Sequence, residues 1–236
     1  MAVKNFYTLN GLYFRKCKNF WIVYHDSKKT AANYGIYCNA GFFGNYKNAA
    51  GKIFTLPVAN LVCDPWVIPV EGRTEVMPHC MNGKLRFCTS DPHTNQFKGM
   101  LVSTFIVGKD GKPYIKRVSA PPADCQYAVS GIPCVIGGEP VKEFDFVNKW
   151  EGWDASPMYG AMRNWIGVKN GEIWLINGKT TTSNYLDSGE FWNKVKSEGF
   201  SDIIALDGGG SAYFSDQNGV KKTWENRRIN NVIVFS

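Results

Sequence analysis

A single carboxylate followed by three glycines and a serine is the pattern in this 236-residue chain that most strongly suggests chemistry. It lies in the stretch IIALDGGGSAYF, where a short apolar run leads to Asp207. The residues that follow it are Gly208, Gly209, Gly210 and Ser211. Glycines leave the backbone bare, so peptide N–H groups can approach an anion closely. A carboxylate at a strand end suits attack on an electron-poor carbon, or a bond to a sugar hydroxyl. Alternatively, the stretch is a purely structural glycine-rich bulge in which Asp207 caps the turn and no ligand binds.

Three other stretches combine glycines with polar side chains. YCNAGFFGNY contains Asn39 and Gly41, which form either a tight turn or an amide and open backbone over an aromatic floor for a sugar. AVSGIPCVIGGEPV contains Gly131 ahead of a short apolar strand, which fits a simple hairpin or the wall of a pocket. Arg163 stands just before another apolar strand. It is either a surface arginine or a guanidinium that binds two phosphate oxygens.

In their order along the chain these four stretches resemble the phosphodiester glycosidase family. That family shows NGGFF, a GGPxL-type strand, RTAIG and LDGGGS, and this chain has NAGFFG, SGIPCVIGG, RNWIGV and LDGGGSAYF. The resemblance covers residues 125–214 and, locally, residues 36–44. The chain departs from the family pattern at Ala40, Ile132, Asn164 and Trp165. These departures leave the substrate's identity open. They are also compatible with a member of the family that binds its ligand without turnover.

The resemblance implies hydrolysis of the bond between a sugar's anomeric carbon and a phosphodiester oxygen, with Asp207 and Arg163 as the catalytic residues. It also implies that substrate or phosphate binds at Asn39, Gly41, Gly131, Gly208, Gly209, Gly210 and Ser211. A phosphate leaving group is a weak base, so neutralising its charge matters more than protonating it. On this hypothesis Arg163 and the glycine backbone hold the phosphate, and Asp207 is nucleophile, base or electrostatic stabiliser. Candidates for a second acid are Glu139, Asp124 and Asp187.

The alternative from another class is a non-catalytic glycan- or phosphate-binding protein of a phage or bacterial surface assembly. The net charge of +7 and the pI of about 9.0 favour an anionic partner in either case. Nucleic acid is a less favoured partner, because the basic residues are scattered and form no concentrated stripe. The N-terminal residues show no basic-then-apolar signal peptide, which predicts a cytoplasmic or phage-associated protein of a bacterium or phage. No apolar run reaches the length of a membrane span.

The seven cysteines include no CxxC pair, which predicts reduced thiols in a reducing compartment. His79, Cys80, Cys88 and His93 fall close together, but their spacing fits no familiar zinc pattern. We therefore predict no metal site and no cofactor, and leave a metal requirement open.

The elements that must position these residues are mostly strands. Asn-Gly and Asp-Gly pairs between short apolar runs predict hairpins with tight turns. The clearest is RNWIGVKNGEIWLING, in which apolar residues alternate on both sides of Asn170-Gly171. One helix is predicted at 188–198, capped by Asp187 and ended by Gly199, and a second at 141–149.

Strand 172–176, helix 188–198 and strand 202–207 predict a crossover between parallel strands. The predicted fold is a single α+β domain over residues 1–236, built on a mixed, hairpin-rich β-sheet with a few helices. Its family-like core is expected in residues 36–44 and 125–236. Residues 45–120 are left as an unassigned insertion or variable part.

Overall fold

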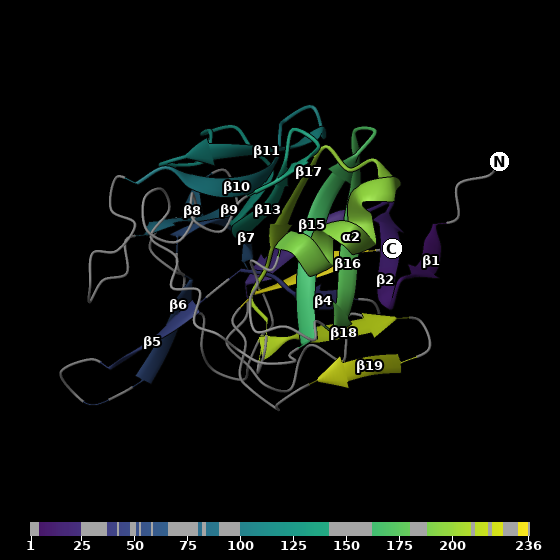
Figure 1. Ribbon diagram of the computed structural model, residues 1–236. Helices are drawn as coiled ribbons and strands as arrows, with labels where there is room; N and C mark the ends of the chain where they lie inside the picture. Colours follow the sequence, from purple (N-terminus) through teal and green to yellow (C-terminus); the bar gives the residue numbers. More distant parts are fainter. Residues whose placement is uncertain are drawn as a thin grey trace.

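The computed structural model shows two large β-sheets packed against each other, with one short α-helix in the part of the chain that it describes (Figure 1). The described residues are 5–24, 37–41, 43–47, 51, 53–57, 59–65, 80–81, 84–89, 100–141, 162–179, 188–208, 211–216, 219–223 and 231–235. No helix among these residues is long and apolar enough to cross a membrane.

The first sheet has seven strands in the order β1-β2-β16-β15-β17-β13-β14, and each neighbouring pair is antiparallel. The bounds are β1 (Phe6–Leu9), β2 (Leu12–Cys17), β13 (Ile132–Ile136), β14 (Glu139–Pro140), β15 (Met162–Lys169), β16 (Glu172–Lys179) and β17 (Asp202–Ala205). The β15–β16 hairpin turns at Asn170 and Gly171, both with positive φ, which confirms the hairpin predicted there.

The second sheet has eleven strands within the described ranges, in the order β11-β10-β12-β7-β3-β20-β4-β18-β19, with β9 on β7 and β8 on β9. The bounds are β3 (Phe20–Tyr24), β4 (Tyr37–Asn39), β7 (Ala59–Pro65), β8 (Cys80–Met81), β9 (Lys84–Thr89), β10 (Val102–Val107), β11 (Pro113–Val118), β12 (Tyr127–Ser130), β18 (Tyr213–Asp216), β19 (Gly219–Thr223) and β20 (Asn231–Phe235). A separate hairpin joins β5 (Phe43–Lys47) and β6 (Ile53–Pro57).

The helix α2 (Ser188–Val195) continues into a 3-10 turn, η2 (Lys196–Glu198), and ends at Gly199 with a left-handed φ of 72°. This confirms the predicted helix, whereas Asp187 and the predicted helix at 141–149 lie outside the described residues. The strands β16 and β17 around α2 are parallel to each other, and β15 lies between them. The described chain is therefore mostly β, richer in strands than the predicted α+β class with a few helices, because most of its apolar runs pair as hairpins.

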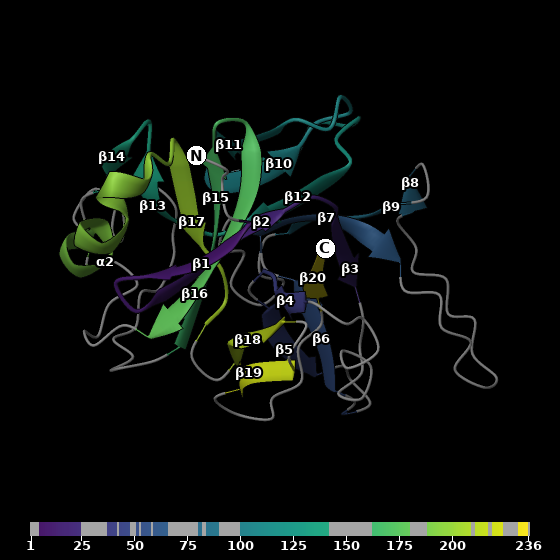
Figure 2. The ribbon, with the colours of Figure 1, turned by 90° about the vertical axis from the view of Figure 1, so that its right-hand side faces the viewer.

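Two apolar clusters cover the two faces of the seven-stranded sheet. Between the sheets, Ile166 and Ile204 join a cluster that includes residues of β3, β7, β10 and β20. On the outer face, Trp165 stacks on Phe191 of α2, with ring centroids 4.5 Å apart. Figure 2 shows α2 on one side of this sheet and β3 and β7 on the other. The strand alternation of β15 thus assigns each of its side chains to one of two cores.

Gly131 is the point where the chain passes from one sheet to the other. It follows β12 of the second sheet and precedes β13 of the first, and its N–H donates to the Ser103 carbonyl at 3.0 Å. A Cβ at this position would lie 2.3 Å from the carbonyl oxygen of Ala205 in β17. Only glycine allows so close an approach between the two backbones.

Candidate active site

Asp207 directly follows the strand end of β17, and its peptide unit is held on both sides. Its N–H donates to the Ala40 carbonyl at 3.2 Å, and its carbonyl accepts a hydrogen bond from the side-chain amide of Asn39. One residue earlier, the Leu206 N–H donates to the Asn164 carbonyl at 2.8 Å and so continues the β15–β17 ladder. Asp207 is partly exposed. The backbone of Asp207 is therefore fixed at a position where the residue is partly open to solvent.

Arg163 lies in β15, and Asp207 follows β17 at the same end of the seven-stranded sheet. In the β15–β17 ladder Trp165 is opposite Ala205, and both face α2. Continuing that antiparallel register by two residues sets Arg163 opposite Asp207, and the alternation of side chains gives both the outward face. Side chains at opposite positions of antiparallel strands have Cβ atoms roughly 4.5–5.5 Å apart. The continued register therefore predicts that these two charged residues lie close together.

Arg163 is buried, and its positive charge acts on the Cys134 thiol. Arg163 has no exposed surface, and Cys134 lies in the outer-face cluster with Trp165. Burial raises the pKa of the Cys134 thiol to about 12. Hydrogen bonds to Ala205 and Trp165 and the positive charge of Arg163 oppose this rise. The effect agrees with the face that strand alternation gives Arg163. Burial places its charge in a low-dielectric setting, which strengthens its attraction for an anion.

Gly208, the first glycine of the run, and Ser211, the residue after it, are described, and both are buried. Gly208 and Ser211 close a turn in which the Ser211 N–H donates to the Gly208 carbonyl at 3.1 Å. The Ser211 hydroxyl is buried without a hydrogen-bond partner in the described part of the chain. Gly209 and Gly210 lie outside the described residues. A buried hydroxyl without a partner costs about 1–3 kcal/mol, so a ligand oxygen in bonding range would stabilise this position.

Asn39 and Gly41 lie next to Asp207, and their contacts are with the protein itself. The Asn39 side chain donates to the Asp207 carbonyl and accepts from the Asn164 amide. The Gly41 N–H donates to the side-chain oxygen of Asn231 at 2.5 Å. These bonds hold the 39–41 segment against the residues after β17. Substrate binding by Asn39 and Gly41 stays a prediction, as it does for Gly131, whose close approach to β17 already requires a glycine.

Three residues at this end were not predicted as site residues: Asn164, Asn177 and Asn231. All are buried, and Asn164 faces the apolar core between the sheets together with Ile166. Asn164 was noted in the sequence only as a departure from the family pattern. A polar side chain at an inward position of an apolar strand is the signal that could have revealed Asn164 and Asn177.

Other predicted groups do not join this end of the sheet. Glu139 lies in β14, beyond a turn where the Gly138 N–H bonds to the Ser201 carbonyl at the opposite end of β17. Asp124 is exposed and pairs with Lys109 at 3.5 Å. The third acid candidate, Asp187, lies outside the described residues.

The candidate metal ligands are only partly covered by the structure. Cys80 and Cys88 lie on β8 and β9, three residues out of register, whereas His79 and His93 lie outside the described residues. The described ranges contain no cluster of three side chains suited to a metal ion.

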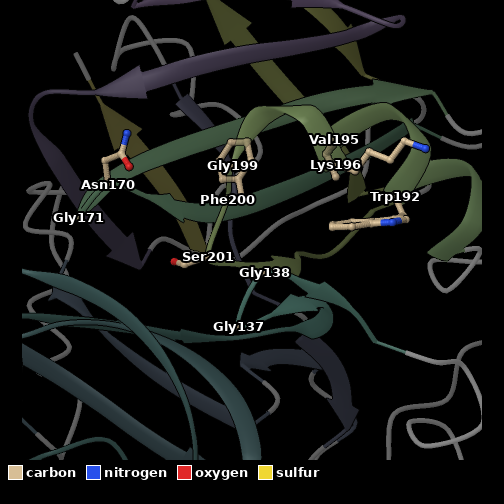
Figure 3. Close-up of a pocket in the computed structure, with 10 residues that line it drawn as sticks. All are labelled: Gly137, Gly138, Asn170, Gly171, Trp192, Val195, Lys196, Gly199, Phe200 and Ser201. Carbon is tan, nitrogen blue, oxygen red and sulfur yellow. The ribbon is translucent and has the colours of Figure 1, made fainter.

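A groove of about 580 Å³ opens at the far end of the sheet (Figure 3). Trp192, Lys196 and Phe200 from α2 and the segment after it face the hairpin turns at Asn170-Gly171 and Gly137-Gly138. Ser201, just before β17, lines this groove, whereas Asp207 follows the end of that strand. The groove is thus separate from the site formed around Asp207.

A family model described as phosphodiester glycosidase matches residues 82–236, which is more than half of the chain. No curated protein sequence matches. Among solved structures, the chain is similar to the zebrafish N-acetylglucosamine-1-phosphodiester alpha-N-acetylglucosaminidase catalytic domain auto-inhibited by its pro-peptide. That likeness has a TM-score of 0.58 at 15% identity and covers 95% of this chain and 76% of the zebrafish chain. At this identity the likeness establishes the fold alone.

Two further solved structures are less similar. A hypothetical protein from Synechocystis aligns with a TM-score of 0.47 at 13% identity, over 97% of this chain and 60% of that one. A putative exported protein from Burkholderia pseudomallei aligns with a TM-score of 0.43 at 11% identity, over 95% of this chain and 73% of that one.

Proposed function

The chain belongs to the phosphodiester glycosidase family, and from this membership we propose that it hydrolyses the bond between a sugar's anomeric carbon and a phosphodiester oxygen. The observation that supports the proposal is the register of the β15–β17 ladder, which sets Arg163 opposite Asp207 when it is continued by two residues. A cation for the departing phosphate and a carboxylate for the anomeric carbon are the two charges that this reaction requires.

In the proposed reaction the bond from the anomeric carbon to the phosphate oxygen breaks, and its electron pair leaves with the phosphate as a monoester. The hydroxyl of a water molecule ends on the anomeric carbon, and the water's other proton goes to solvent. Positive charge develops on the sugar ring as the bond breaks, which a nearby carboxylate stabilises. Asp207 supplies that carboxylate, as nucleophile, base or electrostatic partner. Its clamped peptide and partial exposure support this role.

Arg163 serves the other side of the scissile bond. Negative charge increases on the leaving phosphate oxygen. A buried guanidinium stabilises that charge far more strongly than a guanidinium in water does. The Ser211 hydroxyl and the N–H groups of the glycine run are the proposed additional donors. Because the leaving group is already a weak base, this arrangement needs no strong proton donor among the described residues.

The test is turnover of a panel of glycosyl phosphodiesters, including nucleotide sugars, with release of free sugar as the readout. We expect the Asp207→Asn variant to keep its fold and to lose at least about 10²–10³-fold in kcat, the usual effect of removing a stabilising charge. The matched control is Asp110→Asn, an exposed aspartate in the β10–β11 turn, which should turn over like the wild type. A folded Asp207→Asn variant with wild-type turnover would exclude the proposed role of Asp207.

One observation favours the second candidate function, a glycan- or phosphate-binding protein without turnover. Arg163 has no exposed surface and Ser211 is nearly as buried, so both suit a static anion contact as well as a reacting one. The same panel separates the two functions. Saturable binding of a glycosyl phosphodiester by the wild type, with no sugar released over long incubation, would support the binding protein and contradict the hydrolase.

A further inference from the structure

Three buried asparagine side chains form a continuous hydrogen-bonded chain between the two sheets. The Asn177 amide of β16 donates to the Asn164 side-chain oxygen of β15 at 2.5 Å. The Asn164 amide in turn donates to the side-chain oxygen of Asn39 in β4. All three residues are at most 2% exposed. We call Asn177, Asn164 and Asn39 the amide relay.

The two ends of the amide relay are the backbone carbonyls of the two charged site residues. At one end the Asn177 amide donates to the Arg163 carbonyl at 3.1 Å. At the other end the Asn39 amide donates to the Asp207 carbonyl. The relay therefore joins the peptide units of Arg163 and Asp207 by side-chain bonds, in addition to the strand pairing between β15 and β17.

An apolar core does not need such a relay. Asn164 lies on the same face of β15 as Ile166, and Asn177 lies on the same face of β16 as Leu175, where both neighbours belong to the apolar cluster between the sheets. Apolar side chains at these positions would avoid the cost of burying amides. Fully bonded buried amides are rigid, and each one fixes the direction of its partners. The relay thus adds positional precision rather than apolar burial.

We propose that the amide relay is a positioning device that sets the separation and orientation of the Arg163 guanidinium and the Asp207 carboxylate. The proposal rests on the hydrolytic function proposed above. The relay residues act through the backbone of the two charged residues. A displacement of about 1 Å at a reacting group can reduce turnover about 10²-fold. Because the loss falls on the transition state, kcat should fall while KM changes little.

The test replaces the middle of the relay with a side chain that can neither donate nor accept. For Asn164→Val we expect kcat about 10²-fold below wild type and KM within about threefold. The matched control is Asn60→Val. Asn60 is also a buried asparagine, and its amide bonds to Thr104 and the Val118 carbonyl, outside the relay. A merely structural loss would lower the thermal midpoint of both variants and leave kcat of the folded protein unchanged.

A folded Asn164→Val variant with kcat within threefold of wild type would overturn the proposal, as would an equal loss of kcat in Asn60→Val. If Asn164→Val does not fold, Asn177→Val decides by the same criteria, because it removes the bonds to Arg163 and Asn164 only.

Failure of the hydrolytic function itself would appear differently, as a wild-type protein that releases no sugar from any glycosyl phosphodiester. The relay is then judged by the affinity for inorganic phosphate, measured by titration calorimetry. A weakening of at least tenfold in Asn164→Val and none in Asn60→Val supports positioning of the anion-binding groups. Equal affinity in wild type and Asn164→Val overturns it.

Discussion

Replacing Gly131 by alanine tests the claim that only glycine allows the backbones of residues 131 and 205 to approach so closely. Gly131 is not among the residues with positive φ, so its backbone conformation alone would accept alanine. The added Cβ would lie 2.3 Å from the Ala205 oxygen and 3.0 Å from the Ile204 methyl. Ordinary contact begins near 3.4 Å, so the Gly131 and Ala205 backbones must separate by about 1 Å.

Neither backbone can move freely. The Gly131 N–H donates to the carbonyl of Ser103 in β10 of the eleven-stranded sheet. Ala205 is paired with Ile132 on one side and with Trp165 on the other. Inserting a methyl group into such a site typically costs about 1–3 kcal/mol. For a chain of this length, a loss of about 2 kcal/mol lowers the thermal midpoint by about 4–8 °C.

The displacement should also reach the site, because Asp207 is two residues after Ala205. We expect Gly131→Ala to lose turnover as well as stability, by up to about 10²-fold for a shift near 1 Å. Thermal unfolding followed by circular dichroism gives the stability, and sugar release gives the turnover.

The matched control is Gly108→Ala, where the nearest atom to the new Cβ belongs to the exposed side chain of Asp110, which can rotate away. If Gly131→Ala is as stable as Gly108→Ala, the reasoning from close backbone approach is wrong.

Two further predictions concern charge and protonation. Arg163→Met should reduce turnover at least about 10²-fold, because it removes the proposed cation for the leaving phosphate; a folded variant with wild-type release of sugar would contradict this. Stability should also fall as pH rises above about 9, because burial raises the pKa of the Cys17, Cys38, Cys63 and Cys134 thiols. Above that pH the unfolded thiols ionise while the native thiols stay protonated, and each one removes up to about 1.4 kcal/mol per pH unit. The urea midpoint at pH 8 and pH 10 measures the effect, and an unchanged or higher midpoint at pH 10 would refute it.

The sequence allowed local elements to be predicted well. The Asn170-Gly171 turn and the helix ending at Gly199 depend on neighbouring residues, and the structure has both. The pairing of β2 with β16, and of β20 between β3 and β4, joins segments far apart in the chain. Hydrophobic periodicity gives no sign of such partners. The arrangement of the strands in two large sheets, where a single mixed sheet was predicted, follows from these distant pairings.

In the candidate site, too, local patterns could be predicted and long-range contacts could not. Asp207 and Arg163 stand in distinctive local patterns, and the register of β15 and β17, continued past the end of β17, sets them opposite each other. The amide relay depends on a bond between residues 125 positions apart, Asn164 and Asn39. Whether an asparagine in a strand faces water or a polar partner in the core is decided by the tertiary fold, so its role could not be predicted from the sequence.

The most direct test of the central claim is which bond of the substrate breaks. Hydrolysis of a glycosyl phosphodiester in water enriched in the heavy oxygen isotope, followed by mass spectrometry of both products, answers this in a single reaction. The account predicts that the label enters the sugar as its anomeric hydroxyl and is absent from the phosphate monoester. Label on the phosphate would show attack at phosphorus and contradict a glycosidase built on Asp207 and Arg163.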